Sequence, residues 1–287
     1  MTVLDDAPVI AAASAAPVTV GRGDGPEARL NRASGLGLGV GVIWLSLIVL
    51  IPLAAVVAKA FGNGWGTFWT DVTAHAAVQT LVFTIWTSLL VAAINAVMGT
   101  LLAWVLVRDD FPGKRLVELV IDIPFALPTI VAGVVFLSVY GSNSPIGVDL
   151  LGTRRAITFV LLFVTLPFVV RSVQPVLLAI DTEAEQAAAC LGAKPRTIFR
   201  RVVLPLLLPA IASGAALAFA RAMGEYGSVQ LISGGLDRAR VSSTYTYSLY
   251  QAFQYQAAAA SATILLAISL VVMLGLNYLQ RWVARRG

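Results

Sequence analysis

The sequence contains very few of the residues that build chemical centres. Among 287 residues there is one cysteine, Cys190, and one histidine, His75. A single cysteine excludes an internal disulfide, and a single histidine excludes a histidine-based metal cluster or a Ser-His-Asp triad. The nucleotide-binding pattern G-x-x-x-x-G-K-[ST] does not occur either. We therefore predict that this chain has no catalytic residue and no metal site, and that it binds no cofactor itself.

Charged residues are also scarce. They make up 12% of the chain, and hydrophobic residues make up 58%, whereas about a quarter of an average soluble domain is charged. Together with long apolar runs, this composition predicts a chain embedded in a lipid bilayer. We accordingly interpret the net charge of +5 as a property of loops that sets orientation, and not as a nucleic-acid-binding surface.

Six apolar runs are long enough to cross a bilayer, which predicts an all-α polytopic membrane protein with six transmembrane helices. The first run, Leu36–Ala58, has 23 residues without a charge, enough to span about 30 Å of hydrocarbon. The predicted spans cover residues 36–58, 78–107, 119–140, 156–180, 206–232 and 257–279. Residues 36–287 are thus expected to form one transmembrane domain.

The N-terminal residues 1–35 are rich in Ala, Pro and Gly and have neither a helical nor a strand period. This pattern predicts a disordered tail. A signal peptide is the alternative, but the mildly apolar stretch here follows Asp5 and Asp6, where a signal peptide has Lys or Arg.

Two of the predicted spans contain residues that a lipid-facing helix avoids. In the third span, Pro124 and Pro128 are four residues apart with Thr129 beside them. Prolines free backbone groups, which must then face protein or water rather than lipid. In the fifth span, Arg221 and Glu225 are one helical turn apart. A packing kink and a self-neutralising ion pair explain these features, and so does a substrate pathway; the sequence leaves both interpretations open.

The distribution of Lys and Arg predicts the orientation. On alternate sides of the six spans, 14 of these residues fall on the side of the termini and 6 on the other. The larger group comprises Arg22, Arg29, Arg32, Arg108, Lys114, Arg115, Arg171, Lys194, Arg196, Arg200, Arg201, Arg281, Arg285 and Arg286. The excess predicts that both termini and residues 181–205 lie in the cytoplasm.

The polar stretch 181–205 separates the fourth and fifth spans. We predict two short helical pieces, interrupted at Gly192 and at the proline three residues later. Leu191, Ile198 and Phe199 supply apolar side chains among basic ones. Such an element is suited to receive force from a soluble partner.

The spacing within this stretch resembles the cytoplasmic loop of importer-type ABC permeases. In that family the loop reads E-A-A, three residues, Gly, nine residues, then I-x-L-P; here Gln186 replaces the Glu and Val202 replaces the Ile. The resemblance implies docking into a cleft of a partner ATPase. The implied docking residues are Glu185, Gln186, Ala187, Ala188, Leu191, Gly192, Ile198, Phe199, Leu204 and Pro205.

Four further stretches are similar to the sulfate/thiosulfate branch of these permeases, and within it to the T-type subunit. They are Phe111–Lys114, Asp122–Gly133, Leu166–Pro175 and Arg221–Gly227. The resemblance implies a multi-pass permease in a prokaryotic plasma membrane that forms half of a translocation pathway. Its implied partners are a second similar permease, two copies of a cytoplasmic ATPase that binds ATP and Mg, and an extracytoplasmic sulfate-binding protein.

Three alternatives remain open. Molybdate permeases share the Phe-Pro-Gly-Lys segment and a Gly-Glu-aromatic-Gly segment, so a molybdate or tungstate importer fits the same motifs. A secondary transporter driven by an ion gradient would need acidic or histidine side chains in mid-span, and Glu225 is the one deep candidate. A membrane enzyme would need a catalytic constellation that the sequence lacks. His75 and Cys190 are interpreted as ordinary loop residues.

Overall fold

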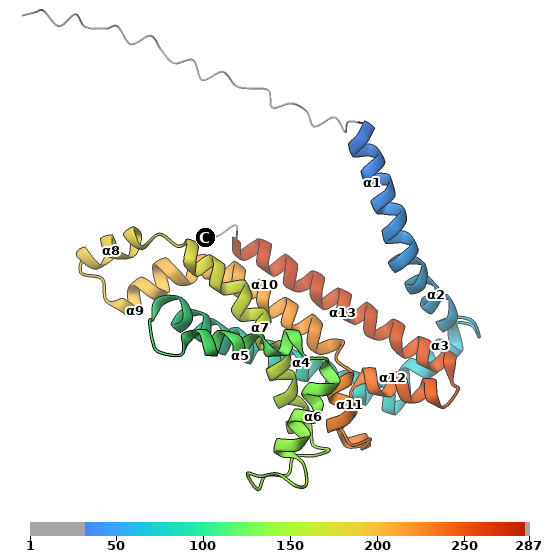
Figure 1. The fold of residues 1–287 in the computed structure, drawn as a ribbon. Helices are drawn as coiled ribbons and strands as arrows, with labels where there is room; N and C mark the ends of the chain where they lie inside the picture. The colour runs from blue at the N-terminus through green and yellow to red at the C-terminus, as the bar shows by residue number, and fades with distance from the viewer. Residues whose placement is uncertain (1–31, 285–287) are drawn as a thin grey trace, which may run out of the picture. The chain divides into compact units, whose positions relative to one another are not determined.

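The computed structural model describes residues 32–284, with side chains described for 36–237 and 239–278. Every regular element within that part of the chain is a helix, which confirms the all-α prediction. The chain divides into two units, residues 1–51 and 52–287. The described part of the first unit contains α1 (Arg32–Leu45) and the π-helical turn η1 (Ser46–Leu50). The second unit contains the helical bundle of Figure 1.

Within the described residues, five helical runs have the length and hydropathy to cross a bilayer: Leu36–Ala60, His75–Arg108, Arg154–Ala179, Pro195–Met223 and Tyr255–Tyr278. They correspond to the predicted first, second, fourth, fifth and sixth spans. Helix α1 begins at Arg32, so the last residues of the predicted disordered tail are helical. Residues 1–31 of that prediction lie outside the described residues.

The predicted third span, residues 119–140, is not one helix. It consists of α5 (Lys114–Ala126) and α6 (Thr129–Tyr140), and the chain changes direction by 117° between them. Pro124 lies inside α5, and the break falls at Leu127 and Pro128. Leu127 has an extended backbone, with φ −83° and ψ 134°, because the proline ring that follows disfavours the helical conformation. The two helices together are a broken span or a re-entrant segment.

The predicted fifth span, residues 206–232, extends nine residues beyond the end of the corresponding helix at Met223. Helix α10 (Leu204–Met223) stops before Gly224, and a short helix α11 (Gly227–Ile232) follows. At its start, α10 continues without interruption from α9 (Pro195–Ile198) and the π-helical turn η2 (Phe199–Val203). Pro195 occupies the first helical turn, where a proline costs no hydrogen bond.

Three further elements, α3, η3 and α12, lie between the predicted spans. Helix α3 (Trp65–Thr73) presents an aromatic cluster in which Phe61 stacks on Trp65 and Phe68. A 3-10 turn η3 (Asp237–Ala239) and helix α12 (Ser242–Gln251) lead to α13 (Tyr255–Ala284). A hydrogen bond of 2.8 Å joins Thr246 of α12 to Ser261 of α13.

The core of the bundle is formed by α4 (His75–Arg108), α7 (Arg154–Ala179) and α10. Two glycines bring them together around the buried Val169. A Cβ atom on Gly99 would lie 2.8 Å from Val169 Cβ, and one on Gly214 would lie 2.8 Å from Val169 Cα. Small residues allow this close approach, which drives helix association in lipid, where hydrophobic burial does not. Asn95 adds a polar contact by donating to Thr165 Oγ1 at 2.8 Å.

Helices α6 and α11 pack by the same device. A Cβ atom on Gly227 would lie 2.6 Å from Thr129 Oγ1, and one on Gly133 would lie 3.0 Å from the Ser228 backbone. The segment after the break at Pro128 is therefore held against the segment that follows α10. Figure 1 shows α6 and α11 beside one another.

Candidate functional site

The loop between α7 and α10 contains a short helix with well-defined ends. Helix α8 (Thr182–Cys190) begins at Asp181, whose side chain accepts a hydrogen bond from the Glu183 backbone at 2.9 Å. Acidic residues in its first turn suit the positive end of the helix dipole. It ends at Gly192, which has φ +80°, a conformation that glycine adopts without strain. The predicted interruption at Gly192 is thus present.

Two contacts hold this loop to the end of α4. Arg108 forms an ion pair with Glu185 of α8, with both side chains 21% exposed. Trp104 makes an edge-to-face contact with Phe199 at the start of the α10 run, with ring centroids 5.3 Å apart. Arg108 also lies over the Trp104 ring, 5.4 Å from its centroid. We call these contacts with α4 the anchor of the loop. They were not predicted from the sequence, because 77 residues separate Arg108 from Glu185.

The anchor divides the predicted docking residues into two groups. Glu185 and Phe199 contact α4, and Ala188, Ile198, Leu204 and Pro205 are half-buried. Gln186, Ala187, Gly192 and Leu191 are exposed, with Leu191 89% exposed. The basic side chains of Lys194, Arg196, Arg200 and Arg201 are exposed as well. Figure 1 shows α8 and α9 projecting at one end of the bundle, so we call residues 181–205 the projecting loop.

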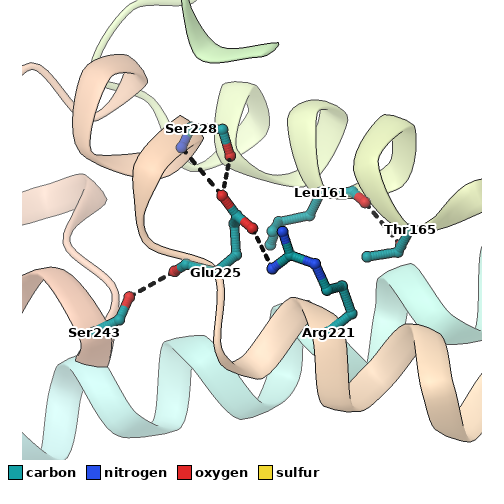
Figure 2. A network of polar contacts seen from close by, with 6 residues as sticks. All are labelled: Leu161, Thr165, Arg221, Glu225, Ser228 and Ser243. Atoms are coloured by element: carbon teal, nitrogen blue, oxygen red, sulfur yellow. Dashed lines mark hydrogen bonds and ion pairs between the residues drawn. The ribbon is translucent and has the colours of Figure 1, made fainter. Parts of the chain in front are cut away.

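Arg221 and Glu225 form an ion pair, which is one of the two interpretations that their spacing left open. Arg221 Nη1 lies 2.5 Å from Glu225 Oε2. The other carboxylate oxygen accepts from the Ser228 backbone at 3.1 Å and from its hydroxyl at 2.9 Å, as Figure 2 shows. Ser243 of α12 donates to the Glu225 carbonyl at 2.6 Å. Because Glu225 is 1% exposed, its carboxylate joins α10 to α11 and has almost no surface to offer a ligand.

A second ion pair was not predicted. Arg171 of α7 donates from Nε to Asp122 Oδ1 at 2.8 Å and from Nη2 to the other carboxylate oxygen, and Nη1 donates to Gln174 at 2.9 Å. Both partners are 40% exposed. The sequence carried a usable signal, since Asp122 and Arg171 are opposite charges inside neighbouring predicted spans, but only the fold brings helices α5 and α7 together.

The break between α5 and α6 lies just beyond this pair. Pro124 is half-buried in the same helix as Asp122, Pro128 is exposed, and Thr129 packs on Gly227. Phe125 makes an edge-to-face contact with Phe168 of α7, with centroids 4.9 Å apart. Pro124 therefore lies in the helix whose Asp122 pairs with Arg171, whereas Thr129 packs on Gly227, two residues after Glu225. Within residues 32–284, no group of three His, Cys, Asp or Glu side chains is placed to hold a metal ion.

Known proteins resemble this chain over most of its length. The sulfate transport system permease protein CysT of Synechocystis sp. is 39% identical over 270 residues, covering 90% of this chain and 94% of that protein. The protein of the same name from Escherichia coli is 38% identical over 259 residues, covering 88% and 94%.

Solved structures support the same architecture. A bacterial ABC transporter involved in the import of the acidic polysaccharide alginate matches with a TM-score of 0.74 at 19% identity, covering 87% of this chain and 95% of that chain. The MetNI methionine ABC transporter matches with a TM-score of 0.55 at 19% identity, covering 74% and 99%. At these identities the likeness concerns the fold.

A family model adds the last observation. The model described as binding-protein-dependent transport system inner membrane component matches residues 95–286, which include α5 to α13, the projecting loop and the three ion pairs described above. The chain belongs to this family of ABC importer permeases and, within it, to the group of CysT-type proteins.

Proposed function

We propose that this chain is a membrane subunit of an ATP-driven sulfate importer. It forms half of the translocation pathway, and a second, similar permease forms the other half. Membership of the family supports the role as an importer subunit, and the names of the CysT relatives support sulfate as the transported anion. In this proposal ATP and Mg bind to a separate ATPase, present in two copies, and a sulfate-binding protein delivers the anion from outside the cell.

The projecting loop, anchored to α4, is the feature that supports coupling between this chain and an ATPase. Its exposed tip at Leu191 offers an apolar side chain, while Glu185 and Phe199 tie the loop to α4. The α9–η2–α10 run then continues without interruption into the bundle. A movement imposed at the tip is therefore transmitted to α4 and α10, two of the three core helices. This is the mechanical requirement for an ATPase partner that drives alternating access.

The orientation of the chain follows the same proposal. With six spans as predicted from the sequence, the projecting loop and both termini would share the side with 14 of the 20 Lys and Arg residues, which supports a cytoplasmic location for them. An ATPase bound at the loop then has access to cytoplasmic ATP.

The pathway is proposed to run past α5, α6 and α7. A half-exposed ion pair such as Asp122–Arg171 is too costly to face lipid, so it faces water or a protein partner. The backbone groups freed at Pro128 require the same environment. A dianionic substrate needs N–H donors or cations that bind weakly enough to release it. Arg171 and Arg221 are candidates for such cations. Each is already paired with a carboxylate, Asp122 and Glu225 respectively, which weakens its attraction for a further anion.

Replacement of Gly192 by leucine tests the coupling. The matched control is Gly147→Leu, because both glycines have positive φ and nothing within 4 Å of a new Cβ atom. The backbone strain is then similar, about 1–2 kcal/mol, but only Gly192 lies in the projecting loop. We expect sulfate uptake and uptake-coupled ATP hydrolysis to fall roughly tenfold in Gly192→Leu, equivalent to about 1.4 kcal/mol, and to persist in the control. Equal activities in the two variants would remove the docking role.

The choice of anion is tested separately. Radiolabelled sulfate uptake is measured in cells with increasing sulfate or molybdate as competitor. Competition by sulfate alone supports the proposal, whereas stronger competition by molybdate favours the molybdate or tungstate importer. Uptake into vesicles that lack ATP and the ATPase would instead favour a secondary transporter.

A further inference from the structure

The end of α4 remote from the projecting loop borders a polar cavity of about 310 Å³. Its polar and aromatic lining comprises His75, Gln79 and Phe83 of α4, Arg154 at the start of α7, and Asp237 and Arg240 around η3. The proposed transport function uses none of these side chains. Because α4 and α7 both begin here, the cavity lies at the level where spanning helices leave the hydrocarbon.

The charges of this cavity favour an anion. Arg240 Nη2 lies 2.6 Å from Asp237 Oδ1, on a carboxylate that is mostly exposed. The Arg154 guanidinium lies over the Phe83 ring, 5.0 Å from its centroid. Burial raises the pKa of the neighbouring Tyr245 phenol, with Arg240 acting against this shift and Asp71 acting with it. Among the described side chains, the cavity is lined by two guanidinium groups and one carboxylate.

An apolar groove of about 460 Å³ adjoins the polar cavity and shares Gln79, Phe83 and Arg154 with it. Val78, Val82 and Trp86 complete its lining. These three residues are four positions apart, so they form one stripe along α4, and all three are exposed. The stripe continues with the exposed Leu90, Val97 and Leu101. On a helix that crosses the bilayer, such a stripe faces acyl chains.

We propose that the cavity and the groove together bind one anionic phospholipid, with its phosphate between Arg154 and Arg240 and one acyl chain along Val82 and Trp86. A phospholipid carries an anionic group directly attached to a long apolar chain, and the two hollows offer the matching pair of surfaces in contact with each other. Basic pockets between spanning helices on the cytoplasmic side of membranes bind lipid headgroups by the same chemistry; in the proposed orientation this pocket faces the opposite side. A free oxyanion would fill the polar cavity only and leave the groove without a role.

The test measures phospholipid retained by the full-length chain, isolated with its associated subunits from vesicles of equal parts phosphatidylglycerol and phosphatidylcholine. Arg154→Gln removes a cation that lines both hollows, and Arg155→Gln is its control, because Arg155 is equally exposed but lines neither. Val82→Trp fills the groove without changing charge. Its control is Val97→Trp, at an exposed site of the same helix outside the groove.

We expect retained phosphatidylglycerol to fall about tenfold in Arg154→Gln, the effect of one charge-assisted hydrogen bond. It should fall in Val82→Trp as well and remain unchanged in both controls. Equal retention in all variants overturns the proposal. Displacement of the lipid by inorganic sulfate, with no effect of Val82→Trp, would identify a free oxyanion site instead. A cross-link from Val82→Cys to an associated subunit would show that protein, not lipid, covers the groove. The transport proposal is unaffected by any of these outcomes.

Discussion

Two ion pairs in this chain link helices of the bundle but differ in their surroundings. Glu225 is 1% exposed and receives two hydrogen bonds from Ser228 in addition to its pair with Arg221. Asp122 and Arg171 are each 40% exposed and form their pair between α5 and α7. Burial makes the first pair a fixed joint, whereas the second is open to its environment on one side. The comparison indicates that an ion pair inside a membrane protein marks structure when it is enclosed and marks a pathway or an interface when it is not.

The carboxylate of the Arg108–Glu185 pair lies between the other two in exposure, at 21% against 1% for Glu225 and 40% for Asp122. If the comparison is valid, loss of stability should decrease in the order of exposure. The effect on transport should not follow that order, because the two more exposed pairs lie where movement is proposed. Three substitutions test this expectation.

The largest loss of stability is expected from Arg221→Met. It leaves the Glu225 carboxylate buried without its cation, which costs about 3–5 kcal/mol. The double variant Arg221→Met, Glu225→Gln carries no buried charge and should recover most of this loss. The measurement is the unfolding free energy in mixed micelles, with the yield of folded protein as a second readout. A double variant no more stable than Arg221→Met would show that the pair is not a closed joint.

Glu185→Gln should have an intermediate effect. The pair is partly solvated, so its loss is expected to cost about 1 kcal/mol in stability, but sulfate uptake should fall more than stability because the projecting loop loses its tie to α4. The control is Glu183→Gln, the same change at an exposed position of the same helix outside the docking residues. Transport assays on cells with matched expression should show little change in the control. Uptake that responds to Glu183→Gln and not to Glu185→Gln would contradict the anchoring role.

The smallest loss of stability is expected from Asp122→Asn, about 0.5 kcal/mol for a pair that faces water. Uptake should nevertheless fall several-fold, since the charge balance of Arg171 is lost beside the proposed pathway. Exchange of the two charges in Asp122→Arg, Arg171→Asp should restore part of the uptake. A large loss of stability with normal uptake per folded molecule would show that Asp122–Arg171 has a structural role like that of Arg221–Glu225 and no role in the pathway.

The sequence was informative where interacting residues share one helix or one loop. The spacing of Arg221 and Glu225 allowed an ion pair as one of two open interpretations, and the break at Gly192 followed from glycine's conformational freedom. The Asp122–Arg171 and Arg108–Glu185 pairs were not predicted, because they depend on which helices become neighbours. Tertiary contacts make that choice, such as Phe125–Phe168 between α5 and α7 and Trp104–Phe199 between α4 and the projecting loop, and no local pattern reveals them.

The prolines illustrate the same limit. Pro167 and Pro175 lie within α7 and Pro209 lies within α10, yet those helices continue. At Pro128 the chain instead turns by 117°. Proline removes a hydrogen bond at each position, and neighbouring helices then decide whether the helix is bent or interrupted. Thr129 packed on Gly227 fixes the segment after Pro128 in its new direction, a tertiary contact that the sequence analysis could not anticipate.

The uninterrupted run from Pro195 to Met223 has a mechanical consequence. Its 29 residues correspond to a rod about 40 Å long at 1.5 Å per residue. The projecting loop is attached at one end, and Arg221 lies in the last turn at the other. A tilt of about 5° around Gly214, at about 1.5 Å per residue, would displace the Pro195 end by roughly 2.5 Å and the Met223 end by roughly 1 Å in opposite directions. The docking tip and the Arg221–Glu225 joint are thus the two arms of one lever, with its fulcrum near Gly214.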